Sequence, residues 1–221
     1  MDNHFEMGLD DLRKQLLLMA SRAETAVNES VQALMQRNFD LALKVRGDDD
    51  IIDQYEIDID DLAIQLLTKA PLASNLRLVT VAMKVSQNLE RIGDEATKIS
   101  KRARDLAQEP PVKIVLDLPR LAGMALAMVK DALDAFVQRD SVAARAIVPR
   151  DKEVDALNRE MHSALAQHMM EHPDAIARCL HWIVAAKSLE RIADHAKNIA
   201  EEVVYLCEAQ DIRHNLKKEG A

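Results

Sequence analysis

The sequence predicts an all-α protein made of two tandem three-helix bundles, which arose by internal duplication and are related by a pseudo-twofold axis. Two observations predict the helices. The 221 residues include only 5 glycines and 6 prolines, too few turn residues for an all-β or doubly wound α/β fold. The apolar residues recur at steps of three and four, which places them on one face of a helix. A third observation, an internal repeat, predicts the two bundles.

The repeat is clearest where residues 85–100 are aligned with residues 185–200. Seven of these sixteen aligned positions are identical, whereas about one would match by chance. Upstream the offset changes from 100 to 102 and pairs Asp49 with Asp151 and Asp53 with Asp155. The expected domains are therefore residues 1–108 and residues 109–221.

Prolines and breaks in the apolar pattern set the limits of three helices in each half. The second helix is expected to end before Pro71 and the third before Pro110, because proline cannot continue a helix. Pro119 suits the first turn of the fourth helix, and Pro173 separates the last two. Short connections predict antiparallel neighbours. The expected helices span residues 9–36, 38–70, 75–107, 119–138, 140–171 and 174–208.

Composition excludes several functional classes. The chain has 29 Lys and Arg against 37 Asp and Glu, a net charge of −8, and only 3% aromatic residues. It therefore lacks the basic stripe and the stacking side chains of a nucleic-acid-binding protein. The longest apolar run, 121–129, is too short to span a bilayer, and the acidic N-terminus is not a signal peptide, so we expect a cytoplasmic protein. Cys179 and Cys207 are expected to be core residues.

Four acidic pairs at i,i+4 spacing are the candidate functional residues. This spacing puts both carboxylates of a pair on one helix face, where like charges repel by a few tenths of a kcal/mol. A bound cation would compensate, and oxygen ligands favour Mg, Mn, Ca or Fe. The predicted metal ligands are Asp49, Asp53, Glu90 and Asp94 in the first half, and Asp151, Asp155, Glu190 and Asp194 in the second.

The position of these acids on their helices predicts a site near the surface. Asp49 and Glu56 interrupt an otherwise apolar stripe of the second helix, so each needs a partner if buried. Glu90 and Asp94 point away from the apolar seam of the third helix and are expected to face outward, into a groove between the second and third helices. Solvated helix faces or interhelical arginine contacts are the alternatives.

Other motifs give weaker signals. His168 and His172 lie one turn apart, but their first-half counterparts are Leu66 and Ala70. The two histidines are therefore expected to form a pair at the end of a helix without a metal. His195 adjoins Asp194 and is a further candidate for the second acid group. The chain contains no G-x-G-x-x-G, P-loop, G-x-S-x-G, H-E-x-x-H or Glu-x-x-His sequence.

The duplicated element and its surroundings resemble the PhoU family. The most specific parts are Leu-Glu-Arg-Ile-x-Asp at 89–94 and 189–194, each with an acidic pair upstream, together with the segments 71–77 and 210–214. The resemblance implies tandem three-helix bundles and a cytoplasmic regulator at a phosphate ABC transporter, through its ATPase subunit, and at a sensor histidine kinase. Such a regulator holds the phosphate-starvation (Pho) regulon off and limits phosphate uptake.

The resemblance also implies metal clusters, reported as iron or zinc in some members, on the eight acids named above. An exposed amphipathic bundle further suggests a homodimer, and contact with the membrane is expected only through partners. Two rival interpretations remain. One is a metal-dependent hydrolase or oxidase acting on phosphate esters, although the sequence shows no nucleophile, phosphate cradle or general base for it. The other is a helical scaffold without metal.

Overall fold

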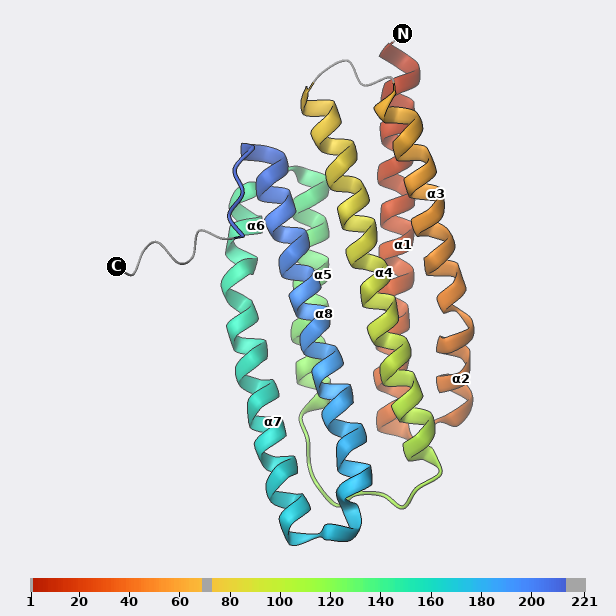
Figure 1. The fold of residues 1–221 in the computed structure, drawn as a ribbon, viewed down its shortest axis with the longest axis vertical. Helices are drawn as coiled ribbons and strands as arrows, with labels where there is room; N and C mark the ends of the chain where they lie inside the picture. The colour runs from red at the N-terminus through yellow and green to blue at the C-terminus, as the bar shows by residue number, and fades with distance from the viewer. Residues whose placement is uncertain (1, 69–72, 214–221) are drawn as a thin grey trace, which may run out of the picture.

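The computed structural model describes residues 2–68 and 73–213, and the described chain is all-α, as predicted (Figure 1). Short 3-10 turns, η1 (Val148–Arg150) and η2 (Pro173–Ala175), precede α7 and α8. The α-helices are α1 (Asp2–Gln36), α2 (Phe39–Gly47), α3 (Asp49–Leu67), α4 (Ala73–Ala107), α5 (Leu118–Gln138), α6 (Ser141–Ile147), α7 (Asp151–Glu171) and α8 (Ile176–Glu208).

The second helix of each half is broken, so the prediction of continuous helices over 38–70 and 140–171 was wrong. In the first half, Gly47 ends α2 and Asp48 separates it from α3, at a residue type with poor helix propensity. In the second half, Pro149 lacks a backbone N–H and disfavours a helical residue before it. The chain there forms the 3-10 turn η1 before α7 starts at Asp151.

Both halves use the same turn to leave their first helix. Arg37 and Arg139 have φ of 55° and 53°, the left-handed conformation that commonly ends a helix. The next residue caps the following helix: Asn38 accepts a hydrogen bond from the Leu41 amide, and Asp140 accepts from the amides of Val142 and Ala143. The duplication is therefore preserved in backbone geometry.

α4 and α8 lie side by side and antiparallel at the centre of the molecule, with α1, α2 and α3 against α4 and α5, α6 and α7 against α8 (Figure 1). Leu89 and Ile92 on α4, and Leu189 and Ile192 on α8, are fully buried. They belong to one apolar core that includes buried residues of all eight α-helices. The two halves thus share a core across the pseudo-twofold axis.

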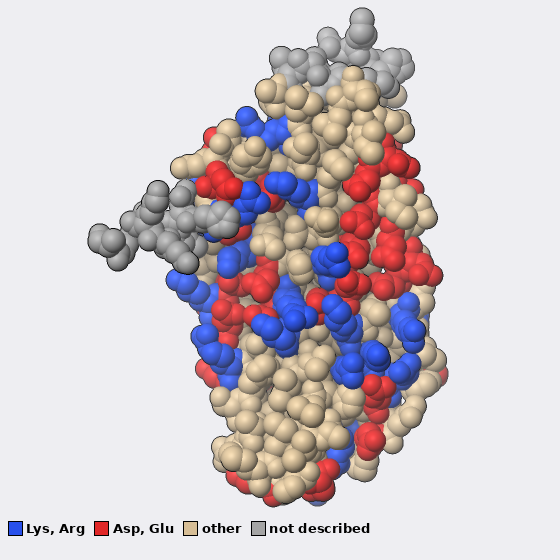
Figure 2. Space-filling view, viewed as in Figure 1, with Lys and Arg blue, Asp and Glu red and all other residues tan. Residues whose placement is uncertain are grey.

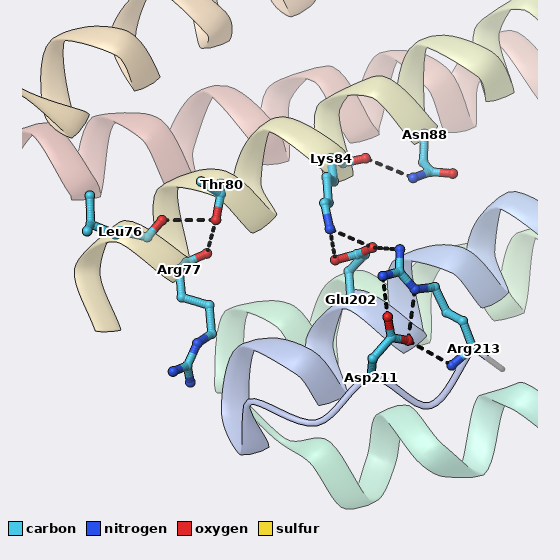
Figure 3. Close-up of polar contacts among 8 residues, drawn as sticks. All are labelled: Leu76, Arg77, Thr80, Lys84, Asn88, Glu202, Asp211 and Arg213. Carbon is cyan, nitrogen blue, oxygen red and sulfur yellow. Dashed lines mark hydrogen bonds and ion pairs between the residues drawn. The ribbon is translucent and has the colours of Figure 1, made fainter. Parts of the chain in front are cut away.

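Polar contacts also join α8 to α4 and to the segment that follows α8 (Figure 3). Glu202 is 6% exposed and accepts hydrogen bonds from Lys84 of α4 and from Arg213 beyond the end of α8. Arg213 also pairs with Asp211, and Ile212 packs against the core. A buried carboxylate is therefore neutralised by cations from two separate elements.

The surface combines a charged middle with less charged ends. Figure 2 shows acidic and basic side chains mixed across the middle of the viewed face and few charges at its lower end, where α7 ends and α8 begins. Exposed apolar side chains there include Met170, Ile176, Leu180 and Val184. Among the described helices, none is both long enough and apolar enough to cross a membrane.

Candidate functional site

The first acid cluster consists of Asp49 and Asp53 on α3 and of Glu90 and Asp94 on α4. Asp49 is the first residue of α3, where the helix dipole favours a carboxylate. It lies against α4, because Asp49 Oδ1 is 3.5 Å from the position that a Cβ on Gly93 would occupy. A glycine in α4 therefore permits the close approach of α3 that brings the two acid pairs near each other.

The carboxylates of the first acid cluster influence one another across the contact between α3 and α4. Burial raises the pKa of Asp49, the Thr97 hydroxyl donates a hydrogen bond that opposes the rise, and the charges of Asp53 and Asp94 add to it. Burial also raises the pKa of Glu90, as does the charge of Asp94. The loss of water around these carboxylates is thus the main effect that disfavours their ionised form, and repulsion between them is the second.

The second acid cluster consists of Asp151 and Asp155 on α7 and of Glu190 and Asp194 on α8. Lys197 Nζ lies 2.7 Å from Asp151 Oδ2, and Lys187 Nζ lies 2.5 Å from Glu190 Oε2. Burial, followed by the charges of Asp151 and Glu190, raises the pKa of Asp194 to about 6. The charges of Asp151, Glu190 and Asp155 all act on Asp194, so the four acids of this half lie near one another.

The acids of the two halves differ in burial, although an outward orientation was predicted only for Glu90 and Asp94. In the second half Glu190 is 7% exposed, and Asp151 on α7 is also 7% exposed. α8 contacts α4, α5 and α7, so a face outside its main apolar seam is covered as well. In the first half Glu90 is half-buried and the Asp94 side chain is 38% exposed, which agrees better with the prediction.

The donor chemistry fits a cation, although the side chains do not form a coordination shell. Within residues 2–68 and 73–213, no three His, Cys, Asp or Glu side chains lie close enough to hold a metal ion. Asp151 Oδ1 is nevertheless buried without a hydrogen-bond partner, which is costly for a carboxylate oxygen. Oxygen-only donors suit Mg²⁺, Mn²⁺ or iron. The assignment of the eight acids as metal ligands stays a prediction.

Three other sequence predictions have clear outcomes. His195 does not join the second acid cluster, because its Nδ1 lies 3.0 Å from Asn88 Oδ1 of α4, at the contact between the central helices. Cys179 is buried as expected, but Cys207 is exposed, and its thiol donates to the Arg139 carbonyl. His168 and His172 form the expected pair at the end of α7, with ring centroids 4.5 Å apart.

Sequence reasoning missed the two lysines of the second acid cluster. Lys187 precedes Glu190 by three residues, and Lys197 follows Asp194 by three. Side chains at this spacing meet on a helix surface, so the signal for Lys187 was present in the sequence. The contact between Lys197 and Asp151 joins α8 to α7, and no local spacing predicts it.

Comparison with known proteins identifies the family. A model of the PhoU domain matches the chain twice, over residues 16–103 and over residues 118–203. The chain belongs to the PhoU family. The first match lies before the linker between α4 and α5, and the second lies after it. The repeat found in the sequence therefore corresponds to two PhoU domains.

Relatives within the PhoU family are similar along most of this chain. The phosphate-specific transport system accessory protein PhoU homolog of Pseudomonas aeruginosa is 41% identical over 212 residues, which cover 95% of this chain and 88% of that protein. The phosphate-specific transport system accessory protein PhoU of Escherichia coli K12 is 33% identical over 211 residues, which cover 95% of this chain and 88% of that protein.

Solved structures of the PhoU family match the fold. The crystal structure of PhoU from Pseudomonas aeruginosa has a TM-score of 0.89 at 40% identity and covers 93% of this chain and 100% of that chain. The phosphate transport system regulatory protein PhoU from Streptococcus pneumoniae has a TM-score of 0.84 at 24% identity and covers 94% and 99%, which supports the fold alone.

Proposed function

We propose that this protein is a cytoplasmic, non-enzymatic regulator that limits phosphate uptake and holds the phosphate-starvation regulon off. It acts as an adaptor between a phosphate ABC transporter, at the ATPase subunit, and a sensor histidine kinase. The observation that carries the proposal is the 41% identity over 95% of the chain to a phosphate-specific transport system accessory protein.

The helical surfaces suit an adaptor. The end formed by α7 and α8 exposes several large apolar side chains, with Met170 77% and Leu180 51% exposed. Exposed apolar side chains that are grouped together indicate a binding surface for another protein. A homodimer or a partner protein would cover this end of the molecule.

Metal ions at the acid clusters are part of the proposal. Iron, zinc, magnesium or manganese would be held by Asp49, Asp53, Glu90 and Asp94, and by Asp151, Asp155, Glu190 and Asp194. A bound ion would offset the repulsion among these carboxylates and tie α3 to α4 and α7 to α8. The ions would stabilise the docking surface rather than take part in a reaction.

Deletion of the gene tests the regulatory role. In phosphate-replete medium, the deletion strain should show raised transcripts of phosphate-starvation genes and faster phosphate uptake, and the wild-type gene should reverse both. Affinity capture with the wild-type protein should recover the transporter ATPase and the histidine kinase. Normal transcripts and uptake after deletion would contradict the proposal.

The metal component needs a separate measurement. The variant D49A/D53A/E90A/D94A should contain less metal by elemental analysis than the wild type, and an unchanged metal content would remove the first site. Metal-loaded protein should not turn over aryl phosphates or polyphosphate. Turnover that disappears with the same variant would instead favour a metal-dependent hydrolase.

A further inference from the structure

The linker between α4 and α5 contains an extended segment, residues 111–117 (Figure 1). Exposure alternates along it: Val112, Ile114 and Leu116 are half-buried, and the residues between them are exposed. The half-buried side chains pack against a small apolar cluster formed by α7, η2 and α8. Alternation with a period of two is typical of a β-strand, and valine and isoleucine favour that conformation. The segment therefore lies on the helices as a single strand with one side turned to water.

The backbone of this strand has unused hydrogen-bonding groups. Within the part of the chain that the structure describes, the N–H and C=O groups of residues 112–116 form no hydrogen bond. Arg37 and Arg178 bind the residues before the strand, through the carbonyls of Glu109 and Pro110. Because a buried backbone group without a partner is costly, the free groups of the strand must be hydrated. A row of hydrated N–H and C=O groups is an edge to which a second strand can bind.

The first half of the molecule has no equivalent strand among its described residues. At an offset of 102, residues 112–116 correspond to residues 10–14, which lie inside α1. Pro110 and Pro111 explain the difference, because a proline restricts the residue before it to an extended conformation. The second half thus carries a strand where the first half carries a helix, so the duplicated fold itself does not require the strand.

The sequence of the strand fits a second copy of itself. Antiparallel pairing centred on Val115 places the two copies of Val115 opposite each other, and Lys113 of each chain opposite Asp117 of the other. These side chains lie on the exposed side of the strand, and Val115 is 99% exposed. Asp117 precedes α5 without a capping hydrogen bond from its side chain, so its carboxylate can meet a lysine. An apolar pair flanked by opposite charges stabilises paired antiparallel strands.

We propose that residues 112–117 are an interaction surface for a second copy of this chain, which binds by antiparallel pairing of the two linkers. The twofold axis passes between the two Val115 residues, so both copies use the same surface and the assembly closes as a dimer. Pro111, which has no N–H group, and the start of α5 limit the strand at its two ends. A contact of this length buries little surface, so the dimer should be weak. The inference does not depend on the regulatory role proposed above.

Charge exchange tests the pairing. Sedimentation equilibrium from about 1 µM to about 1 mM protein should show monomer and dimer. V115D, which puts two carboxylates opposite each other, should raise the dimer dissociation constant about tenfold or more, and so should K113D, which would face the partner's Asp117. K113D/D117K exchanges the two charges and should return the constant to within about threefold of the wild type. K130D, at an exposed lysine of α5, is the control and should have no effect.

Cross-linking and hydrogen exchange test the register. In a C207S background, which removes the exposed native thiol, V115C should form a disulfide-linked dimer under mild oxidation, because residue 115 faces itself across the axis. V142C, at a position of α6 that is 78% exposed, should not. The amides of residues 112–117 should also exchange more slowly at high protein concentration than at low concentration.

Several outcomes would overturn the inference. These are a monomer at all concentrations, a dimer that V115D and K113D leave unchanged, and protection of residues 112–117 only when a different protein is added. Circular dichroism of each variant checks that it is folded. None of these outcomes bears on the proposed regulatory role, because gene deletion tests that role separately.

Discussion

Lys84 on α4 and Glu202 on α8 form an ion pair of 2.9 Å that connects the two halves of the molecule. Glu202 is 6% exposed, whereas the Lys84 side chain is 41% exposed. The carboxylate is therefore the buried member of the pair, and Arg213 supplies its second positive neighbour at 3.0 Å. Substitution of Glu202 should therefore lower the stability of the protein more than substitution of Lys84 or of Arg213.

Substitution E202Q should lower the free energy of unfolding by about 1–3 kcal/mol, because it removes the buried negative charge that pairs with Lys84 and Arg213 and replaces one acceptor oxygen with an amide donor. Urea denaturation monitored by circular dichroism measures the change. R145A, which breaks an exposed pair with Glu208, is the control and should cost at most about 1 kcal/mol. Equal losses in the two variants would argue against a special role for Glu202.

The shared core predicts that the two halves unfold together. L89A and L189A each empty a fully buried position in the central helices, so each should cost about 2–5 kcal/mol. Both variants should still show a single transition by calorimetry and by circular dichroism. L180A, at a 51% exposed position on α8, should change stability by less than about 0.5 kcal/mol. A separate early transition for one half would contradict a common core.

The pKa of Asp194 predicts a pH-dependent effect of D194N on metal-free protein. Because the pKa of the folded protein is raised from 3.8 to about 6, the stabilising effect of the bound proton is complete below pH 4 and is lost as the pH rises through 6. D194N should therefore stabilise the protein by roughly 1–2 kcal/mol at pH 7.5, after allowance for solvent screening, and by about a third of that amount at pH 4.5. Urea denaturation with a chelator present measures both.

D134N, which changes an exposed aspartate on α5, is the matched control for D194N. It should leave the free energy of unfolding nearly unchanged at both pH values. A D194N effect of the same size at pH 4.5 and 7.5 would indicate that the substitution acts through packing rather than through charge.

Substitutions of glycine test the close contact between α3 and α4. A Cβ on Gly93 would lie 2.9 Å from Ile52 Cδ1, so G93L should push the helices apart and cost about 1–3 kcal/mol. G123A is the control, because a Cβ at Gly123 on α5 meets no atom within 4 Å. G123A should instead stabilise the protein by about 0.5–1 kcal/mol through helix propensity. Thermal melts distinguish the two signs.

Sequence reasoning predicted the features that depend on local spacing. Apolar periodicity predicted the helices, and the repeat predicted equivalent acid pairs, which the structure places between α3 and α4 and between α7 and α8. Sequence reasoning failed where contacts between helices distant in the sequence decide which side chains are buried. The burial of Glu190 and the contact of His195 with Asn88 arise because α8 is packed against four other α-helices. The breaks at Asp48 and Pro149 were marked by Gly47 and by proline, but the apolar pattern continues across them.

The antiparallel contact of α4 with α8 joins two copies of one sequence element within a single polypeptide. A protein with one repeat alone would leave the buried face of its long helix open to water. A second such subunit, related to the first by a twofold axis, would cover that face with its own equivalent face. Fusion of the two subunits removes the dependence of this contact on protein concentration. Fusion also frees each copy to change separately, so one half can acquire lysines where the other keeps uncharged residues.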